Sequence, residues 1–101
     1  QIPPERLDQI AHRFAELEAR MASGTLEGEA FVRASRDYAE LEPVAKIAAE
    51  VKAAREEMAG LTEMLADPEM KAMAEEELAS LKATLPDLER RLAIALLPRD
   101  S

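Results

Sequence analysis

Apolar residues recur at alternating steps of three and four along most of this chain, the spacing that places side chains on one face of an α-helix. The first such stretch predicts a helix from Pro4 to about Ala22, and Gly24 suits the left-handed position after a helix end. The second predicts a helix over residues 27–41. The expected buried faces are Leu7, Ile10, Phe14, Leu17 and Met21 in the first helix, and Phe31, Ala34, Tyr38 and Leu41 in the second.

Two longer stretches carry heptad seams. One predicts a helix over residues 43–65, with Glu42 as a junction, because a residue that precedes proline disfavours the α region. The other predicts a helix from Pro68 to about Leu97, and its register continues past Pro86, which favours a kink over a stop. Two helices meeting at Thr84–Pro86 are the alternative. The seams are Val44, Ile47, Val51, Ala54, Met58, Leu61 and Leu65, and Ala74, Leu78, Leu81, Leu85, Leu88, Leu92 and Ala95.

The connection between these two seams predicts how the chain folds back on itself. Asp67 is suited to cap the last helix, Pro68 to its first position, and Glu69 to place negative charge at the positive end of the helix dipole. A loop of about two residues forces its two helices to be antiparallel. We therefore expect an all-α fold, with one domain over residues 1–101. It would be a small antiparallel bundle of about four helices, built on a long hairpin of the third and fourth.

One glycine interrupts the strongest helical pattern. Gly60 lies off the seam of the predicted helix 43–65 and costs about 1 kcal/mol of helix propensity relative to alanine. Close approach of another helix would explain the glycine. The alternative is that Gly60 is a point of low stability in the helix.

Composition narrows the function classes. Ala, Leu, Glu, Lys and Arg dominate, as in all-helical proteins, and no cysteine is present, which excludes disulfides and thiolate metal sites. The net charge is −8 and the basic residues are dispersed, so the chain is a poor stand-alone binder of nucleic acid. No apolar run is long enough for a membrane span.

No set of residues points to catalysis, a cofactor or a metal. His12 lies off the apolar face with no evident partner, and we expect it to face solvent. The acidic runs Glu56–Glu57 and Glu75–Glu77 lack the Glu-x-x-His motif of di-iron bundles, which favours solvated helix faces. Ser/His/Asp sets and glycine-rich phosphate loops are absent.

Methionines and arginines supply weaker candidates for binding. Met58, Met64, Met70 and Met73 gather near one end of the predicted hairpin, with Met70 and Met73 expected to be the more exposed. Methionine at such places more often fills core gaps than forms an adaptable binding surface. Arg33 and Arg36 could contact rRNA or an acidic protein. Pairing with Asp37, Glu40 or Glu29 along the helix is the favoured interpretation.

Three short sequence motifs, in this order along the chain, indicate a protein family. Residues 34–41, Ala-Ser-Arg-Asp-Tyr-Ala-Glu-Leu, resemble a Ser-Arg-Glu-Tyr-Ala-x-Leu helix, with Asp37 in place of Glu. Residues 64–74 read Met-Leu-Ala-Asp-Pro-Glu-Met-Lys-Ala-Met-Ala and resemble a connection between two helices. Residues 96–100 read Leu-Leu-Pro-Arg-Asp and resemble a Leu-Leu-Pro-Lys-Asp string at the end of a helical domain. From about Ala30 onward the chain is similar to the N-terminal helical domain of bacterial class I peptide chain release factors, and within them to the first of the two types.

The resemblance implies an accessory domain that docks a cytoplasmic, stop-codon-dependent termination factor on the ribosome. The implied partners are the stalk base of the large subunit, both protein and rRNA, and the GTPase-type release factor. The chain has neither Gly-Gly-Gln nor Pro-x-Thr, so we expect an excised domain without release activity of its own. A generic helical hairpin for self-association, or an adaptor, is the alternative function.

The resemblance also selects positions to test. The candidate partner-binding residues are Arg36, Tyr38, Asp67, Pro68, Glu69 and Met70. For Tyr38 we favour packing with the hydroxyl at the surface, and for Asp67 and Pro68 we favour capping. No cofactor and no metal are expected.

Overall fold

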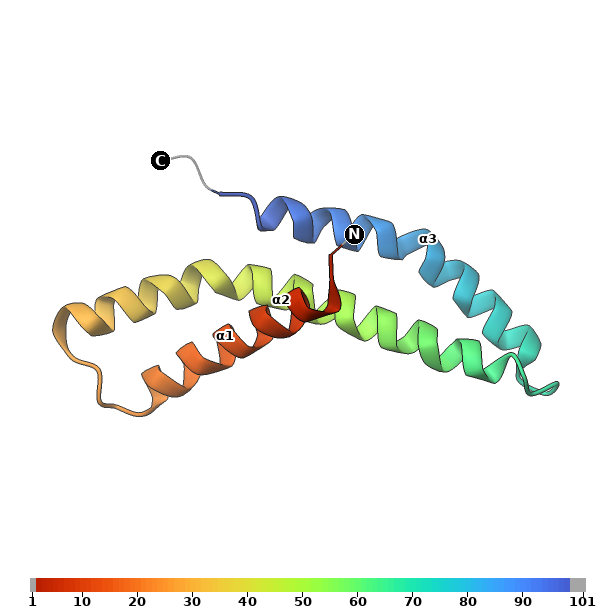
Figure 1. Ribbon diagram of the computed structural model, residues 1–101, viewed down its shortest axis with the longest axis horizontal. Coiled ribbons are helices and arrows are strands. Elements are labelled where there is room, and N and C mark those ends of the chain that lie inside the picture. Colours follow the sequence, from red (N-terminus) through yellow and green to blue (C-terminus); the bar gives the residue numbers. More distant parts are fainter. Residues whose placement is uncertain (1, 99–101) are drawn as a thin grey trace.

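A computed structural model describes residues 2–98 of the chain. It contains three helices: α1 (Pro4–Ala22), α2 (Gly28–Met64) and α3 (Lys71–Ala95), and the described residues form no strand (Figure 1). The all-α prediction is confirmed, whereas the count of about four helices is wrong. Arg99 and Asp100 of the third motif lie outside the described residues.

The first helix forms as the apolar pattern predicts. Pro3 is the extended N-cap and Pro4 opens the helix, where a missing N–H costs nothing. Acidic Glu5 in the first turn and basic Arg20 in the last turn both suit the helix dipole. Gly24 follows the helix end with a φ of 73°, a conformation that glycine adopts without strain. The predicted face is inward, with Leu7, Ile10 and Leu17 buried and Phe14 and Met21 half-buried.

The second helix corrects the predicted junction at Glu42. Residues 27–41 and 43–65 were expected to form two helices, but α2 passes through Pro43 without a break. Pro43 cannot donate to the Ala39 carbonyl, and such a proline costs about 3 kcal/mol in a helix interior. Tertiary packing offsets this cost, because apolar residues on both sides of the proline contact the same core. They are Leu41, Val44, Ala45 and Ile47.

The connection between α2 and α3 is longer than predicted and is built differently. It spans residues 65–70, and α3 begins at Lys71 and ends at Ala95. Asp67 and Pro68 therefore do not cap or open the helix, which is a correction of both roles. Asp67 instead shapes the turn: its Oδ1 accepts from the Glu69 N–H at 3.0 Å, and its carbonyl accepts from the Met70 N–H at 3.0 Å.

The third helix passes through its proline as the seam register predicts. Pro86 lies inside α3, so the alternative of two helices meeting at Thr84–Pro86 is wrong. Figure 1 shows α3 curving along its course over the second half of α2, and the two helices are antiparallel.

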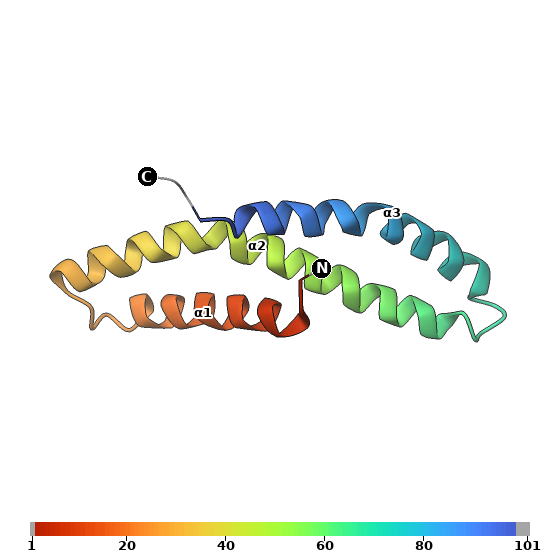
Figure 2. The same ribbon diagram turned by 45° about the horizontal axis from the view of Figure 1, so that its top comes forward.

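The three helices form an elongated molecule rather than a compact bundle. α2 is the central rod, α1 packs against its first half and its middle, and α3 packs against its middle and its second half (Figures 1 and 2). The described residues extend 60 × 31 × 17 Å, with a radius of gyration of 17.9 Å. A compact domain of about 100 residues has a radius of about 13 Å.

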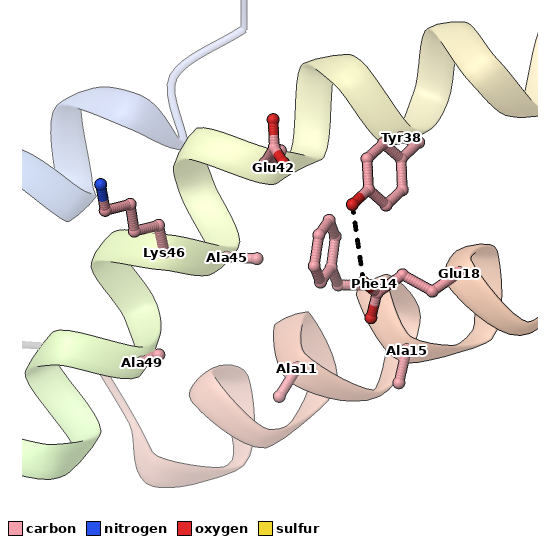
Figure 3. A pocket seen from close by; sticks show the side chains of 9 residues that line it. All are labelled: Ala11, Phe14, Ala15, Glu18, Tyr38, Glu42, Ala45, Lys46 and Ala49. Atoms are coloured by element: carbon pink, nitrogen blue, oxygen red, sulfur yellow. Dashed lines mark hydrogen bonds between the residues drawn. The ribbon is translucent and has the colours of Figure 1, made fainter.

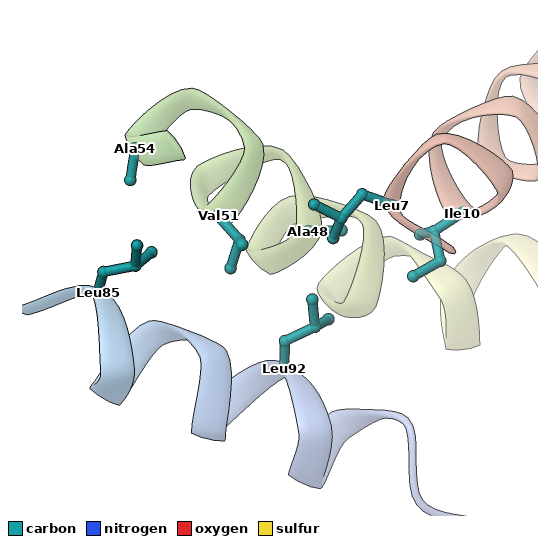
Figure 4. Packing of buried hydrophobic residues seen from close by; sticks show 7 residues of the cluster. All are labelled: Leu7, Ile10, Ala48, Val51, Ala54, Leu85 and Leu92. Atoms are coloured by element: carbon teal, nitrogen blue, oxygen red, sulfur yellow. The ribbon is translucent and has the colours of Figure 1, made fainter. Parts of the chain in front are cut away.

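The main core lies where all three helices meet, near the middle of α2 (Figure 4). It consists of Leu7 and Ile10 of α1, Ala48, Val51 and Ala54 of α2, and Leu85 and Leu92 of α3. A second, smaller cluster of Leu61, Ala74 and Leu78 lies between α2 and α3 alone. Both predicted heptad seams therefore face inward.

A part-buried arginine, Arg55, links α2 to α3 and to the segment before α1, beside the main core. Arg55 of α2 donates to the Ile2 carbonyl at 2.8 Å and to Glu89 of α3 at 2.5 Å. Lys52 forms a second, exposed link to Asp8 of α1 at 3.2 Å. The contact between Arg55 and Glu89 is charge-assisted, and each of the two side chains is only about a fifth exposed. It is therefore the strongest of the six ion pairs in the described chain.

Candidate functional site

The candidate residues fall on two surfaces that the fold keeps apart. Arg36 and Tyr38 lie in the first half of α2, whereas Asp67, Pro68, Glu69 and Met70 form the loop at the far end of that helix. At ~1.5 Å per residue, Tyr38 and the end of α2 are roughly 40 Å apart. The six residues therefore do not form one site.

An open groove runs between α1 and α2 beside Tyr38 (Figure 3), and we call it the α1–α2 groove. Its volume is about 470 Å³. Four alanines, two from each helix, leave the space that larger side chains would fill. The lining residues are Ala11, Phe14, Ala15, Glu18, Tyr38, Glu42, Ala45, Lys46 and Ala49. This groove was not predicted from the sequence, although pairs of alanines four residues apart on both helices signal it.

Tyr38 is held in this groove by packing and by one hydrogen bond. Its ring stacks on Phe14, with centroids 4.8 Å apart and planes inclined by 24°. Its hydroxyl donates to Glu18 Oε2 at 3.5 Å (Figure 3). Burial chiefly raises the pKa of Tyr38, and the negative charges of Glu18 and Glu42 raise it further. The prediction that Tyr38 packs with its hydroxyl near the surface is confirmed.

Arg36 and Arg33 lie on the exposed side of α2. With Glu29 and Val32 they line a shallow hollow of about 270 Å³. The pairing that was predicted along the helix is not found among the ion pairs of residues 2–98, and Asp37 instead lies 3.9 Å from Arg13 of α1. The arginines thus remain candidates for a partner.

The loop residues lie at the end of the molecule that α1 does not reach (Figure 2). Asp67, Pro68 and Glu69 are exposed and Met70 is half-buried. Met64 and Met73 are each 39% exposed, while Met58 packs against both apolar clusters. The predicted exposure of Met73 is confirmed. Met70 was also expected to be exposed but is half-buried, and Met64 is exposed instead.

The titratable groups considered for chemistry are solvated. The His12 side chain is 83% exposed and lies 3.9 Å from Glu16. Both acidic runs are exposed, as predicted. Within residues 2–98 no three His, Cys, Asp or Glu side chains are grouped so as to hold a metal ion. None of the helices in this part of the chain has the length and apolarity to cross a membrane.

Comparison with known proteins identifies the family. The model of the PCRF domain matches residues 10–101. Proteins named peptide chain release factor 1 are 79% identical over 100 residues in Erythrobacter litoralis, 64% over 96 in Novosphingobium aromaticivorans and 50% over 97 in Gluconobacter oxydans. These alignments cover 99, 95 and 96% of the chain but 28, 27 and 28% of the relatives. No solved structure gives a significant match. The chain therefore belongs to the PCRF domain family, together with peptide chain release factor 1.

Proposed function

We propose that this chain is the ribosome-docking domain of a factor that terminates translation at stop codons by promoting peptidyl-tRNA hydrolysis. The observation that carries the proposal is the 79% identity to a protein named peptide chain release factor 1, of which the chain spans about a quarter. Such a factor acts in the cytoplasm, where translation takes place. In this proposal the codon-reading and hydrolytic functions belong to the remaining three quarters of the length of such a factor.

The shape and surface of the domain support a docking role. A rod 60 Å long can reach a partner that lies well away from the rest of a factor. The docking partners in this proposal are the stalk base of the large subunit and the GTPase-type release factor. The exposed candidates for these contacts are Arg36 on α2 and Asp67–Glu69 in the loop.

The alternative of self-association loses its main support. Self-association of a helical hairpin would need exposed heptad faces, but the seams of α2 and α3 are buried against each other and against α1. No other feature of the described chain favours it over docking. Light scattering over a range of concentrations is expected to give the mass of a monomer.

Co-sedimentation with large ribosomal subunits tests the proposed function. We expect the chain to bind purified subunits and to release no peptide from loaded ribosomes on its own. Arg36→Glu tests one contact within this assay, because that side chain is exposed and its change should leave helicity intact. Failure of the wild-type chain to bind subunits at any workable concentration would contradict the proposal.

A further inference from the structure

The α1–α2 groove has an apolar floor that the described chain leaves open. Two helices each present one continuous face to it, over Ala11–Glu18 of α1 and Tyr38–Ala49 of α2 (Figure 3). At ~1.5 Å per residue these faces are roughly 10 and 16 Å long, or about two to three helical turns. Ala15 and Ala49 are exposed, and their small side chains leave the groove unfilled. A trough of this shape accepts side chains from one face of a partner helix.

Two carboxylates lie beside Tyr38 in this groove without a cation. Glu18 of α1 accepts a hydrogen bond from the Tyr38 hydroxyl at 3.5 Å, and the negative charge of Glu42 of α2 also acts on that hydroxyl. Neither carboxylate belongs to any of the six ion pairs within residues 2–98. Lys46 is the one cation among the described lining residues, and its side chain points away from the two aromatic rings (Figure 3). The groove therefore offers negative charge that this part of the chain does not neutralise.

The aromatic rings beside these carboxylates narrow the class of ligand. Phe14 and Tyr38 stack with centroids 4.8 Å apart and are both half-buried, so part of the ring pair stays open to the groove. A planar guanidinium stacks on aromatic rings and donates paired N–H groups to carboxylates, whereas an ammonium group is a compact and more strongly hydrated charge. An apolar floor suits the aliphatic stem of such a cation. Arginine is the side chain that combines these properties.

From this arrangement we propose that the α1–α2 groove binds an arginine side chain of a partner protein. The guanidinium stacks against the ring pair and donates to Glu18 and Glu42, while its aliphatic stem covers the alanines. The groove volume of about 470 Å³ exceeds that of one arginine side chain, so the partner also inserts apolar neighbours from the same helix face. Nucleic acid is disfavoured, because its phosphates would meet the same carboxylates. The inference goes beyond the ribosome-docking function proposed above and does not depend on it.

Tyrosine fluorescence reports directly on the groove, because Tyr38 is the one tyrosine of the chain and no tryptophan is present. Butylguanidinium represents the arginine side chain, with butanol as its neutral counterpart and butyrate as its anionic one. Backbone amide chemical shifts over residues 11–18 and 38–49 locate the bound probe independently. We expect butylguanidinium to bind about tenfold more tightly than butanol, and butyrate not to bind.

Charge-neutral variants that keep side-chain shape test the role of the carboxylates. Glu18→Gln with Glu42→Gln removes the two charges from the groove. Glu5→Gln with Glu50→Gln is the matched control, because these residues are exposed, lie outside the groove on the same two helices, and give the same net charge. Circular dichroism checks that both variants keep wild-type helicity. The groove variant should bind butylguanidinium about tenfold more weakly and butanol as before, while the control should bind both probes as the wild type does.

A third variant tests the floor of the groove. Ala15→Leu with Ala49→Leu fills the space from two exposed positions, so the fold should tolerate it. It should weaken the binding of butylguanidinium and of butanol alike, because both stems lose the same apolar surface.

A helical peptide tests whether the arginine belongs to a protein. The probe is an alanine-rich peptide with one central arginine and a leucine one turn to either side, and its counterpart carries glutamine in place of the arginine. We expect the arginine peptide to bind at least about tenfold more tightly than butylguanidinium, because its leucines cover the floor, and the glutamine peptide to bind more weakly than the arginine peptide.

Four results would overturn the proposal. They are equal binding by the groove variant and its control, butanol binding as tight as that of butylguanidinium, a peptide that binds no more tightly than butylguanidinium, and a dimer in light scattering that butylguanidinium dissociates. The last result would assign the groove to a second copy of this chain. None of them bears on binding to ribosomal subunits, so the proposed function stands or fails separately.

Discussion

Gly60 is a single residue whose replacement should stabilise the protein. A Cβ atom built at this position would meet nothing within 4 Å, so close approach of another helix does not explain the glycine. We predict that Gly60→Ala raises the free energy of unfolding by about 1 kcal/mol, because alanine loses less backbone entropy in a helix. Urea denaturation followed by circular dichroism measures the change.

Gly24 provides the matched control for that substitution. It also has open space around it, but its φ of 73° strains any residue with a Cβ. Gly24→Ala should therefore lower the free energy of unfolding by about 1 kcal/mol. A loss at Gly60 or a gain at Gly24 would contradict the conformational argument.

Tyr38 should make stability depend on pH in the alkaline range. Its folded pKa lies above the ordinary tyrosine value of 10.0, chiefly through burial and then through the negative charges of Glu18 and Glu42. The folded state therefore holds the proton more tightly, and this contribution is complete below pH 10.0 and is lost as pH rises through the folded pKa. The expected result is that the urea midpoint of Tyr38→Phe falls less steeply above pH 10.0 than that of the wild type. Parallel curves for the two proteins would count against a raised pKa.

Burial of individual residues was predicted well except for Phe31, which was expected on a buried face but is 46% exposed, whereas turn chemistry was not predicted. The three- and four-residue spacing identifies the inward positions because a helix face repeats with that period. Asp67 illustrates the failure. An aspartate followed by proline and glutamate can serve as an N-cap or as the start of a turn. The length of the loop distinguishes the two roles, and these three residues alone do not reveal that length.

Among the helices, Pro43 of α2 shows how tertiary packing overrides a local rule. The proline removes one hydrogen bond from α2, yet the helix continues because the residues around it belong to the core. We predict that Pro43→Ala raises the free energy of unfolding by about 1–3 kcal/mol, since it restores the bond to the Ala39 carbonyl without disturbing a buried contact. Thermal and urea unfolding of the variant test this directly.

Pro68 is the control for Pro43, because it lies in the loop and interrupts no helix. Pro68→Ala should give no gain in stability, since it only increases the freedom of the unfolded chain. A gain at Pro68 as large as at Pro43 would show that the effect does not come from the helix.

Helix boundaries were thus the weakest part of the sequence-based prediction. Pro86 was predicted to lie inside a helix because an apolar seam runs through it in register, whereas Pro43 was predicted to open a separate helix and in fact lies inside α2. The predicted face before Pro43 (Phe31, Ala34, Tyr38 and Leu41) and the heptad seam after it (from Val44) were assigned to separate helices, so the continuity of α2 was not predicted. The α1–α2 groove was missed for a related reason: it depends on how two helices face each other, which no single periodicity encodes.

The two apolar clusters should give the elongated molecule unequal stability along its length. The main core is enclosed by three helices and tied by Arg55. The second cluster lies at the far end of the α2–α3 hairpin, residues 56–81, which we call the tip; it has only two helices around it and a high density of like charge. Local opening of the tip should therefore cost less free energy than global unfolding. Backbone amides of residues 57–80 are expected to exchange with solvent faster than those of residues 44–54.

Leu92→Ala separates local opening from global unfolding. Leu92 is fully buried in the main core, and its truncation should lower the free energy of global unfolding by about 3 kcal/mol. Amides of residues 44–54 exchange through global unfolding, so they should exchange about 100-fold faster in the variant. Amides of the tip should keep their rates, because opening the tip leaves Leu92 packed. Leu61→Ala, within the tip cluster, should accelerate both sets. If Leu92→Ala instead accelerated both sets equally, the rod would unfold as one unit, and a partner at the tip would stabilise the whole domain rather than its end alone.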